Sequence, residues 1–195
     1  MFTGIVESTG TVTDRVDSDG GIRLRLRARV DGLRVGDSVA LNGACLTAAA
    51  VEEGGFWVEA VPETLRRTTI GEAAAGVAVN LERAMPASGR FDGHLVQGHV
   101  DGVGTVREVA PEGDGKRMRV TVPEGLRRYL VEKGSVAVDG VSLTVAEIHQ
   151  EGFSVALIPH TLRVTVLGTR RPGDRVNLEI DILAKYVERL LEAGR

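Results

Sequence analysis

The sequence predicts an all-β chain that folds as two small closed barrels in tandem, followed by one C-terminal helix. Three observations lead to this prediction. The chain of 195 residues repeats itself once, each copy contains short apolar segments separated by turn residues, and the last segment has helical spacing without a counterpart in the first copy. Short strands with regular turn signals favour a closed barrel, which leaves no exposed sheet edge.

The internal repeat consists of ordered matches at a nearly constant offset. The offset is 97 positions over most of the copy and 94 positions in its opening segment, so the second copy is three residues longer in its early part. The matching segments are residues 39–47 with 136–144, 55–56 with 152–153, 62–66 with 159–163, 79–82 with 176–179, 4–7 with 98–101 and 10–12 with 104–106. So many matches in one order indicate a tandem duplication.

Each copy contains segments with the pattern of strands. Residues 22–26 and 117–122 alternate apolar and polar side chains, as half-buried strands do. Residues 77–82 and 176–180 are the predicted closing strands of the two copies.

Two dipeptides mark tight hairpins. Asn42-Gly43 and Asp139-Gly140 stand between apolar runs at equivalent places, and this pairing is a strong signal for a two-residue hairpin turn. Short helices are expected at residues 125–132 and directly after Pro62 and Pro159.

The boundary between the copies is expected near residues 86–93, where Pro, Ser and Gly cluster. The predicted domains are residues 1–93 and 94–181, with a separate helical tail at residues 182–195. In that tail, apolar residues at positions 183, 186, 187, 190 and 191 have helical spacing. Two interpretations are open: the stripe packs on its own barrel, or it binds partner chains.

Composition excludes several classes of protein. The net charge is −3, and charges of both signs are interspersed, so no basic face for nucleic acid is expected. No apolar stretch approaches the ~20 residues of a membrane helix, and the start lacks the pattern of a signal peptide. Cys45 is the single cysteine, which rules out a disulfide framework and favours the cytoplasm.

Motifs for phosphate, dinucleotide or metal binding are missing. Residues 113–116 lack the spacing and the hydroxyl residue of a phosphate loop. His94 and His99 could pair on a metal, but no third ligand is evident. We therefore expect neither a metal nor an organic cofactor.

Unlike side chains stand at equivalent positions of the two copies. The pairs are Cys45 with Ser142, Glu63 with His160, and Ile5 with His99. A lone cysteine is most often a small buried apolar residue. A repeat that served structure alone would keep only glycines and core residues, whereas this one also keeps polar groups beside them. That pattern favours a small-molecule pocket in each barrel.

Together these segments resemble the riboflavin synthase family over essentially the whole chain. The segments that carry the resemblance are residues 1–7, 42–47, 93–102, 139–144 and 177–181. Each match is weak alone, but their order on a duplicated chain is highly specific. Asp92 departs from the family, in which glycine is commoner at this position, and it lies outside the implied catalytic set.

The resemblance implies a fold, an assembly and a reaction. The implied chain has two six-stranded Greek-key barrels and forms a homotrimer, largely through its C-terminal helix. The implied site lies between the N-terminal barrel of one subunit and the C-terminal barrel of its neighbour. There, one molecule of 6,7-dimethyl-8-ribityllumazine donates a four-carbon unit to another without any cofactor, which gives riboflavin and 5-amino-6-ribitylaminouracil. Lumazine synthase is an additional candidate partner.

The family pattern also implies site residues. The implied catalytic set is Phe2, Cys45, His99, Ser142 and Asp181. His99 suits proton transfer near neutral pH, Ser142 and Asp181 could polarise or relay, and Cys45 could attack or donate a hydrogen bond; the resemblance leaves these roles open. The implied substrate-binding residues are Gly4, Ile5, Val6, Cys45, Leu46, Thr47, Glu59, Ala60, Val61, Pro62, Glu63, Thr64, Gly98, His99, Val100, Lys133, Ser142, Leu143, Thr144, Ile158, Pro159, His160, Thr161, Leu162 and Arg163.

Two other functions are compatible with a duplicated barrel. Lumazine proteins share the implied fold and hold the same ligand as an optical antenna or carrier, but they lose catalytic groups, mainly in the second barrel. Here His99, Ser142, Thr144 and Asp181 all match the enzyme pattern. The third reading, an unrelated barrel for another small molecule, would require the motif matches to be accidental.

Overall fold

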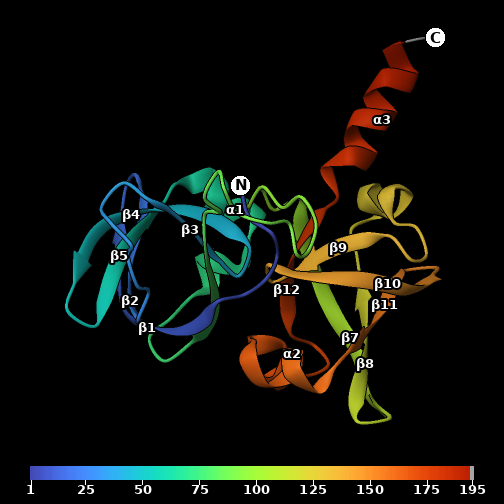
Figure 1. Cartoon of the computed structure of the whole chain (residues 1–195), viewed down its shortest axis with the longest axis horizontal. Coiled ribbons are helices and arrows are strands. Elements are labelled where there is room, and N and C mark those ends of the chain that lie inside the picture. The colour runs from blue at the N-terminus through green and yellow to red at the C-terminus, as the bar shows by residue number, and fades with distance from the viewer. Residues whose placement is uncertain (194–195) are drawn as a thin grey trace.

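The computed structural model describes residues 1–193 and contains two closed six-stranded barrels and a C-terminal helix (Figure 1). The strands of the first barrel are antiparallel and follow the order β1-β2-β5-β4-β3-β6 around the circle. They are β1 (Ser8–Ser18), β2 (Gly21–Arg27), β3 (Ser38–Leu41), β4 (Ala44–Glu52), β5 (Gly55–Ala60) and β6 (Ala78–Arg83). The predicted fold class is confirmed.

The second barrel repeats this topology, in the order β10-β11-β8-β7-β12-β9 around its circle. Read from β7 through β8, the same circle is β7-β8-β11-β10-β9-β12, which corresponds strand for strand to the order in the first barrel. The repeat in the sequence is therefore also a repeat in the structure. The strands are β7 (Gly102–Glu112), β8 (Gly115–Thr121), β9 (Ser135–Val138), β10 (Val141–His149), β11 (Gly152–Leu157) and β12 (Arg175–Ile180). Residues 194 and 195 of the predicted tail lie outside the described residues.

Short helices follow the fifth strand of each barrel. Helices α1 (Pro62–Arg67) and α2 (Pro159–Val164) both begin with proline, whose fixed φ suits the first helical position. Each continues into a 3-10 turn, η1 (Thr69–Glu72) or η3 (Val166–Thr169). The helix predicted at residues 125–132 is wrong in type and length: it is the 3-10 turn η2 (Glu124–Tyr129), because Leu130 returns to extended backbone and is buried in the second core.

The two predicted hairpin turns are confirmed. Asn42 and Gly43 have φ values of 44° and 79°, and Asp139 and Gly140 have values of 46° and 76°. Positive φ at both central residues is the signature of a type I′ turn, which matches the twist of the flanking strands.

The hairpin tips meet where the barrels touch. A Cβ placed on Gly43 would lie 2.7 Å from the backbone nitrogen of Gly140, and the converse distance is also 2.7 Å. Only glycine permits so close an approach. The tips therefore mark a pseudo-two-fold axis that relates the first copy to the second.

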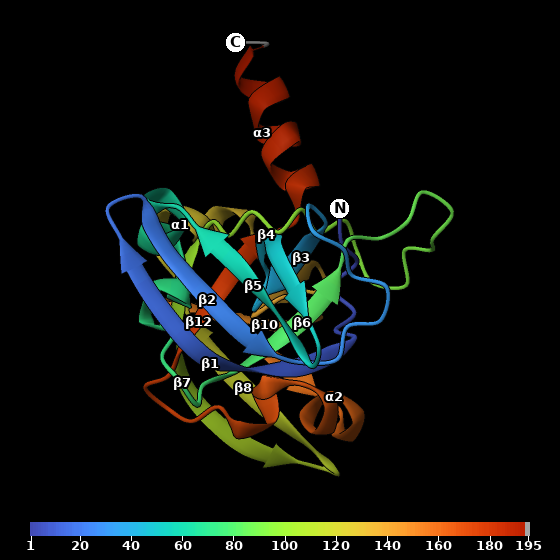
Figure 2. The ribbon, with the colours of Figure 1, turned by 90° about the vertical axis from the view of Figure 1, so that its left-hand side faces the viewer.

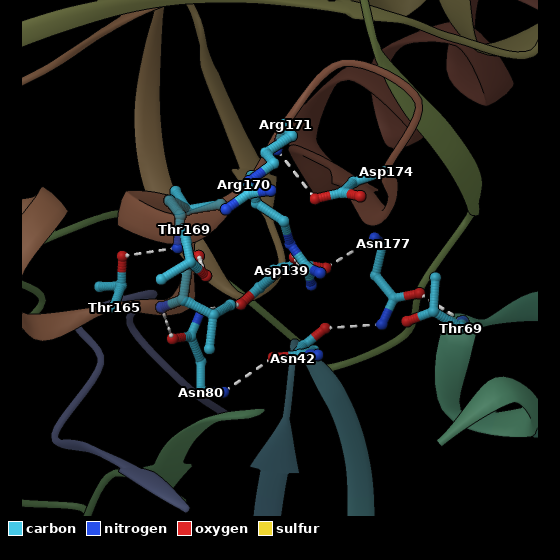
Figure 3. Close-up of polar contacts among 12 residues, drawn as sticks. Asn42, Thr69, Asn80, Asp139, Thr165, Thr169, Arg170, Arg171, Asp174 and Asn177 are labelled. Atoms are coloured by element: carbon cyan, nitrogen blue, oxygen red, sulfur yellow. Dashed lines mark hydrogen bonds and ion pairs between the residues drawn. The ribbon is translucent and has the colours of Figure 1, made fainter. Parts of the chain in front are cut away.

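Two asparagines connect the barrels beside these tips (Figure 3). Asn80 donates from Nδ2 to the carbonyl oxygen of Asp139 over 2.8 Å and accepts from the backbone N–H of Val166. Its repeat partner Asn177 donates to the carbonyl oxygen of Asn42 over 2.8 Å and accepts from the N–H of Thr69. Each barrel thus supplies hydrogen-bond partners to backbone N–H and C=O groups of the other. Such groups need partners when they are buried.

One part of this network is asymmetric. Asp139 is completely buried, and its Oδ2 accepts two hydrogen bonds from the Arg170 guanidinium at 3.0 and 2.5 Å. Burial raises the pKa of Asp139, and the charge of Arg170 lowers it. The first copy has the neutral residues Asn42 and Ala73 at the equivalent positions, so only the second copy contains a buried ion pair here.

Helix α3 (Ile182–Ala193) projects away from the second barrel (Figures 1 and 2). Lys185 Nζ lies 2.6 Å from Asp101 Oδ1, and Glu188 contacts Tyr129 and Arg128, so one side of the helix is tied to the barrel. The opposite stripe is exposed by 56% to 73%, and it comprises Leu183, Tyr186, Val187, Leu190 and Leu191. The interpretation in which this stripe packs on its own barrel is wrong. Among the described helices, none has the length and apolarity needed to cross a membrane.

The ion pair gives a stability prediction. Replacing Arg170 with alanine should lower the free energy of unfolding by about 3–5 kcal/mol, because Asp139 would be left as a buried, uncompensated charge. Adding Asp139→Asn should restore most of the loss, since this pair of residues is what the first copy has at the same positions. Denaturant unfolding of the single and double variants measures both effects. A double variant no more stable than Arg170→Ala would contradict this account.

Candidate functional site

The opening segment of each copy lies on the other copy's barrel. Gly4 accepts from the backbone N–H of Ser142 in the second barrel over 2.8 Å, and Val6 packs against the second core. In the mirrored arrangement, Gly98 accepts from the N–H of Cys45 in the first barrel over 2.8 Å. Val100 packs against the first core. Each pocket region is therefore built from both copies.

A hollow of about 200 Å³ lies beside Cys45 in the first barrel. Its wall from the second copy carries His99, and α1 supplies Glu63, Thr64 and Arg67. Gly98 has a φ of +77°, and a Cβ there would lie only 2.6 Å from the Cβ of Cys45. The opening segment can approach Cys45 this closely because residue 98 is glycine.

Charged groups surround the entrance to this hollow. Glu63 accepts from Arg67 over 2.8 Å and from Arg66 over 2.5 Å. Hydrogen bonds from these two guanidinium groups, with Arg67 the larger cause, lower the pKa of the exposed Glu63 carboxyl. The anionic carboxylate and Arg67 can serve as acceptor and donor for a polar ligand at the entrance.

The equivalent place in the second barrel holds a serine–histidine pair. His94 Nδ1 lies 2.7 Å from Ser142 Oγ, within reach of a hydrogen bond whose direction depends on the tautomer. Among the described residues, His94 Nε2 is a buried nitrogen without a hydrogen-bond partner. Burial lowers the pKa of His94, and the negative charge of Asp181 raises it, so the imidazole is held in its neutral form at neutral pH.

The remaining members of the predicted catalytic set occupy supporting positions. Asp181 Oδ1 accepts from the N–H of Leu183 over 3.0 Å, as a residue capping α3 does. Phe2 is fully buried between the barrels, with Val96 and Ala40 in the same cluster and Cys45 packed against it. His99 lies with Cys45, not with Ser142, because its segment crosses to the first barrel.

Of the predicted binding residues, Leu46 and Ala60 are buried in the first core, and others are exposed in both copies. In the first copy, Thr47 and Glu59 are exposed at paired positions of β4 and β5, and Val61 and Pro62 are exposed at the start of α1. The exposed residues at the matching places of the second copy are Thr144, Ile158, Pro159, His160 and Arg163.

Lys133 is also exposed, in a left-handed turn with a φ of 65° that leads into β9. Residues 1–193 contain no cluster of three His, Cys, Asp or Glu side chains arranged to hold a metal.

The sequence singles out His94 only as a possible metal ligand and does not predict its contact with Ser142. Glu82 and Glu179 were not predicted either, and their buried carboxylates accept hydrogen bonds from the opening segments. The signal for the two glutamates was present: both are charged residues at one repeat position within an apolar closing strand. No sequence signal places His94 beside Ser142, because that contact joins a linker to a distant strand.

Known proteins resemble both halves and the whole of this chain. The lumazine binding domain family matches residues 3–84 and again residues 97–181. Riboflavin synthase of Mycobacterium bovis is 45% identical over 200 residues that cover 100% of both chains. Riboflavin synthase of Actinobacillus pleuropneumoniae is 41% identical, over 98% of this chain and 90% of its own.

Solved structures show the same architecture. LumP complexed with riboflavin superimposes with a TM-score of 0.86 at 26% identity, over 92% of this chain and 99% of its own. LumP complexed with 6,7-dimethyl-8-(1'-D-ribityl) lumazine gives a TM-score of 0.83, also at 26% identity and the same coverage. With two lumazine binding domains and full-length relatives above 40% identity, the chain belongs to the riboflavin synthase family.

Proposed function

We propose that this protein is a riboflavin synthase, which transfers a four-carbon unit between two molecules of 6,7-dimethyl-8-ribityllumazine. The products are riboflavin and 5-amino-6-ribitylaminouracil. The observation that carries the proposal is the pair of repeat-equivalent positions with unlike reactive groups: Cys45 lines a hollow together with His99, and Ser142 lies 2.7 Å from His94. Two identical substrates that play opposite roles suit two pockets of one origin and different chemistry.

Positioning is the first contribution of such pockets. Holding two substrates in a reactive arrangement can replace a bimolecular encounter and lower the barrier by up to ~7–11 kcal/mol. The strand ends, α1 and α2 supply the residues that we assign to ring and ribityl binding. Backbone groups of residues 4–6 and 98–100 complete this set, and their rigid placement by cross-barrel hydrogen bonds supports the assignment.

Acid–base chemistry is the second contribution. The C7 methyl group of the donor is acidified by the conjugated ring, so a base must take its proton, and the acceptor must be primed at a ring carbon by a nucleophile. In the first pocket, His99 is the candidate base and Cys45 the candidate nucleophile or hydrogen-bond donor. In the second, neutral His94 can accept the Ser142 hydroxyl proton, and this makes Ser142 a stronger nucleophile or a relay.

The active site is proposed to form between two copies of the chain. Helix α1 lines the hollow beside Cys45, and its repeat counterpart α2 lies on the opposite side of the contact between the barrels (Figures 1 and 2). This separation supports a site that a neighbouring chain completes. A neighbouring copy can supply the second pocket, and the exposed stripe of α3 offers a surface for the homotrimer that the family resemblance implies.

We also propose that the protein works in the cytoplasm. A reducing cytoplasm suits a thiol at Cys45 that has no disulfide partner among the described residues. Association with lumazine synthase stays a prediction.

A second candidate is a lumazine-binding protein without turnover. The similarity to LumP favours it specifically, because LumP shares the fold over 92% of this chain. The riboflavin synthases that are 41% and 45% identical favour the enzyme instead, as do His99, Ser142, Thr144 and Asp181, which match the enzyme pattern.

Purified protein mixed with 6,7-dimethyl-8-ribityllumazine should form riboflavin without added metal or cofactor, and dialysis against a strong chelator should leave the rate unchanged.

Ser142→Ala should lower kcat by about 10²-fold with little change in binding, if the hydroxyl acts in the transition state. Absorbance and fluorescence follow both quantities. For the unsubstituted protein, tight binding without turnover would identify the antenna or carrier function. If the protein neither binds nor converts the lumazine, its ligand is an unrelated small molecule.

The proposed role of His94 predicts a pH dependence. Because burial places its pKa below the ordinary 6.5, kcat should fall as the pH drops through that lowered value and the imidazole becomes charged. The stability should also fall as the pH drops from the ordinary 6.5 of the unfolded chain through the lowered folded-state pKa, because unfolding takes up a proton in that window. In His94→Gln this acidic limb of the kcat–pH profile should disappear, whereas His149→Gln, at the end of β10, should keep it. An acidic limb retained in His94→Gln would assign the titration to another group.

The assembly prediction concerns α3. Leu190→Glu combined with Val187→Glu should convert a trimer into single chains in sedimentation velocity, because both side chains are exposed within one chain and available to a partner. The thermal unfolding of each barrel should change little. Arg189→Lys on the same helix is the matched control. A trimer that survives the double substitution would show that the barrels alone hold the copies together.

A further inference from the structure

Two buried glutamates occupy equivalent positions in the closing strands of the barrels. Glu82 in β6 is 6% exposed, and Glu179 in β12 is 4% exposed. Glu82 accepts from the backbone N–H groups of Thr3 at 2.6 Å and Gly4 at 3.0 Å, and also from the Thr3 hydroxyl at 2.8 Å. Glu179 accepts from the N–H groups of Gln97 at 2.6 Å and Gly98 at 2.9 Å.

These hydrogen bonds lead from one barrel into the pocket region of the other. Glu179 belongs to the second barrel, but Gly98 accepts from the Cys45 N–H of the first barrel, and His99 follows directly. Glu82 belongs to the first barrel, but Gly4 accepts from the Ser142 N–H of the second barrel. The two connections are related by the pseudo-two-fold axis.

We propose that Glu82 and Glu179 are positioning residues that act crosswise: each closing strand holds the backbone wall of the pocket in the opposite barrel. Glu179 fixes the segment that carries His99 over Cys45, and Glu82 fixes the segment that lies on Ser142. The consequence for catalysis rests on the proposed function, whereas the crosswise hold does not.

The chemistry explains why a carboxylate stands at both places. Burial raises the pKa of Glu82 and of Glu179, and the donated backbone hydrogen bonds lower it, so burying each carboxylate is unfavourable until its donors are in place. An apolar residue would fill the space without that penalty. A carboxylate offers two oxygens to two consecutive N–H groups, whereas an amide offers one oxygen and turns its NH₂ group toward a donor.

Amide hydrogen exchange in the full chain tests the crosswise hold without substrate. Glu179→Gln should make the Cys45 amide exchange about tenfold faster and leave the Ser142 amide unchanged, since a charge-assisted hydrogen bond to the Gly98 segment is lost. Glu82→Gln should do the reverse. Glu72→Gln removes an exposed carboxylate that also links the barrels, through Arg175, and it should affect neither amide.

A milder variant covers the case in which a buried substitution prevents folding. Thr3→Val removes one donor to Glu82 and the acceptor of the Ile5 N–H, both within the opening segment, so it should speed exchange at Ser142 and leave Cys45 unchanged. An effect confined to the amide of the substituted residue's own barrel, or equal at both amides, would overturn the proposal.

Turnover separates a positioning role from a purely structural one. Glu82→Gln should raise KM for the lumazine about tenfold while kcat changes much less, because the wall that Glu82 holds contributes to binding before and during reaction alike. Glu179→Gln should raise KM similarly and also lower kcat, because it releases the segment that carries His99. KM unchanged in both variants would overturn the positioning role. Absence of turnover in the unsubstituted chain would overturn the proposed function alone, because the exchange pattern is read without substrate.

Discussion

The contact between the two hairpin tips is the constraint on which the rest of the structure depends. Gly43 and Gly140 approach so closely that neither position has room for a Cβ atom, and the carbonyls beside them must find partners within the protein. Asn80 and Asn177 provide those partners across the axis. Because each barrel satisfies groups of the other, the two copies form one unit, and the pseudo-two-fold relation is fixed by hydrogen bonds as well as by packing.

This arrangement explains why the pockets are shared between copies. With the tips held together, the opening segment of each copy reaches the strand that carries Cys45 or Ser142 in the other. His99 and Val100 of one segment line the hollow beside Cys45, and Ile5 stands at the repeat position of His99 in the other. A single barrel would lack one wall of its pocket region, because its own opening segment lies on the other barrel. The duplication supplies that wall from the opening segment of the other repeat.

The sequence predicted those features that depend on local pattern. The barrels could be predicted from strand alternation, from the Asn42-Gly43 and Asp139-Gly140 turns and from the 97-residue offset. Alternation and turn signals depend only on neighbouring residues, and the offset shows that the same pattern occurs twice. The contact of His94 with Ser142 and the clamps of Glu82 and Glu179 depend on which distant segments meet. The direction of the α3 stripe was also open, since helical periodicity defines an apolar face but does not identify what covers it.

The two barrels are related by a pseudo-two-fold axis but carry different side chains at equivalent positions. Cys45 and His99 stand where the other pocket has Ser142 and Ile5, and the neutral pair Asn42 and Ala73 corresponds to the ion pair of Asp139 with Arg170. The barrels provide two equivalent places for one kind of ligand, and the substitutions give those places different chemistry. In the proposed reaction two identical substrates play opposite roles, and unlike residues at equivalent positions suit that division. The proposed trimer would use the exposed stripe of α3, which a single chain leaves uncovered.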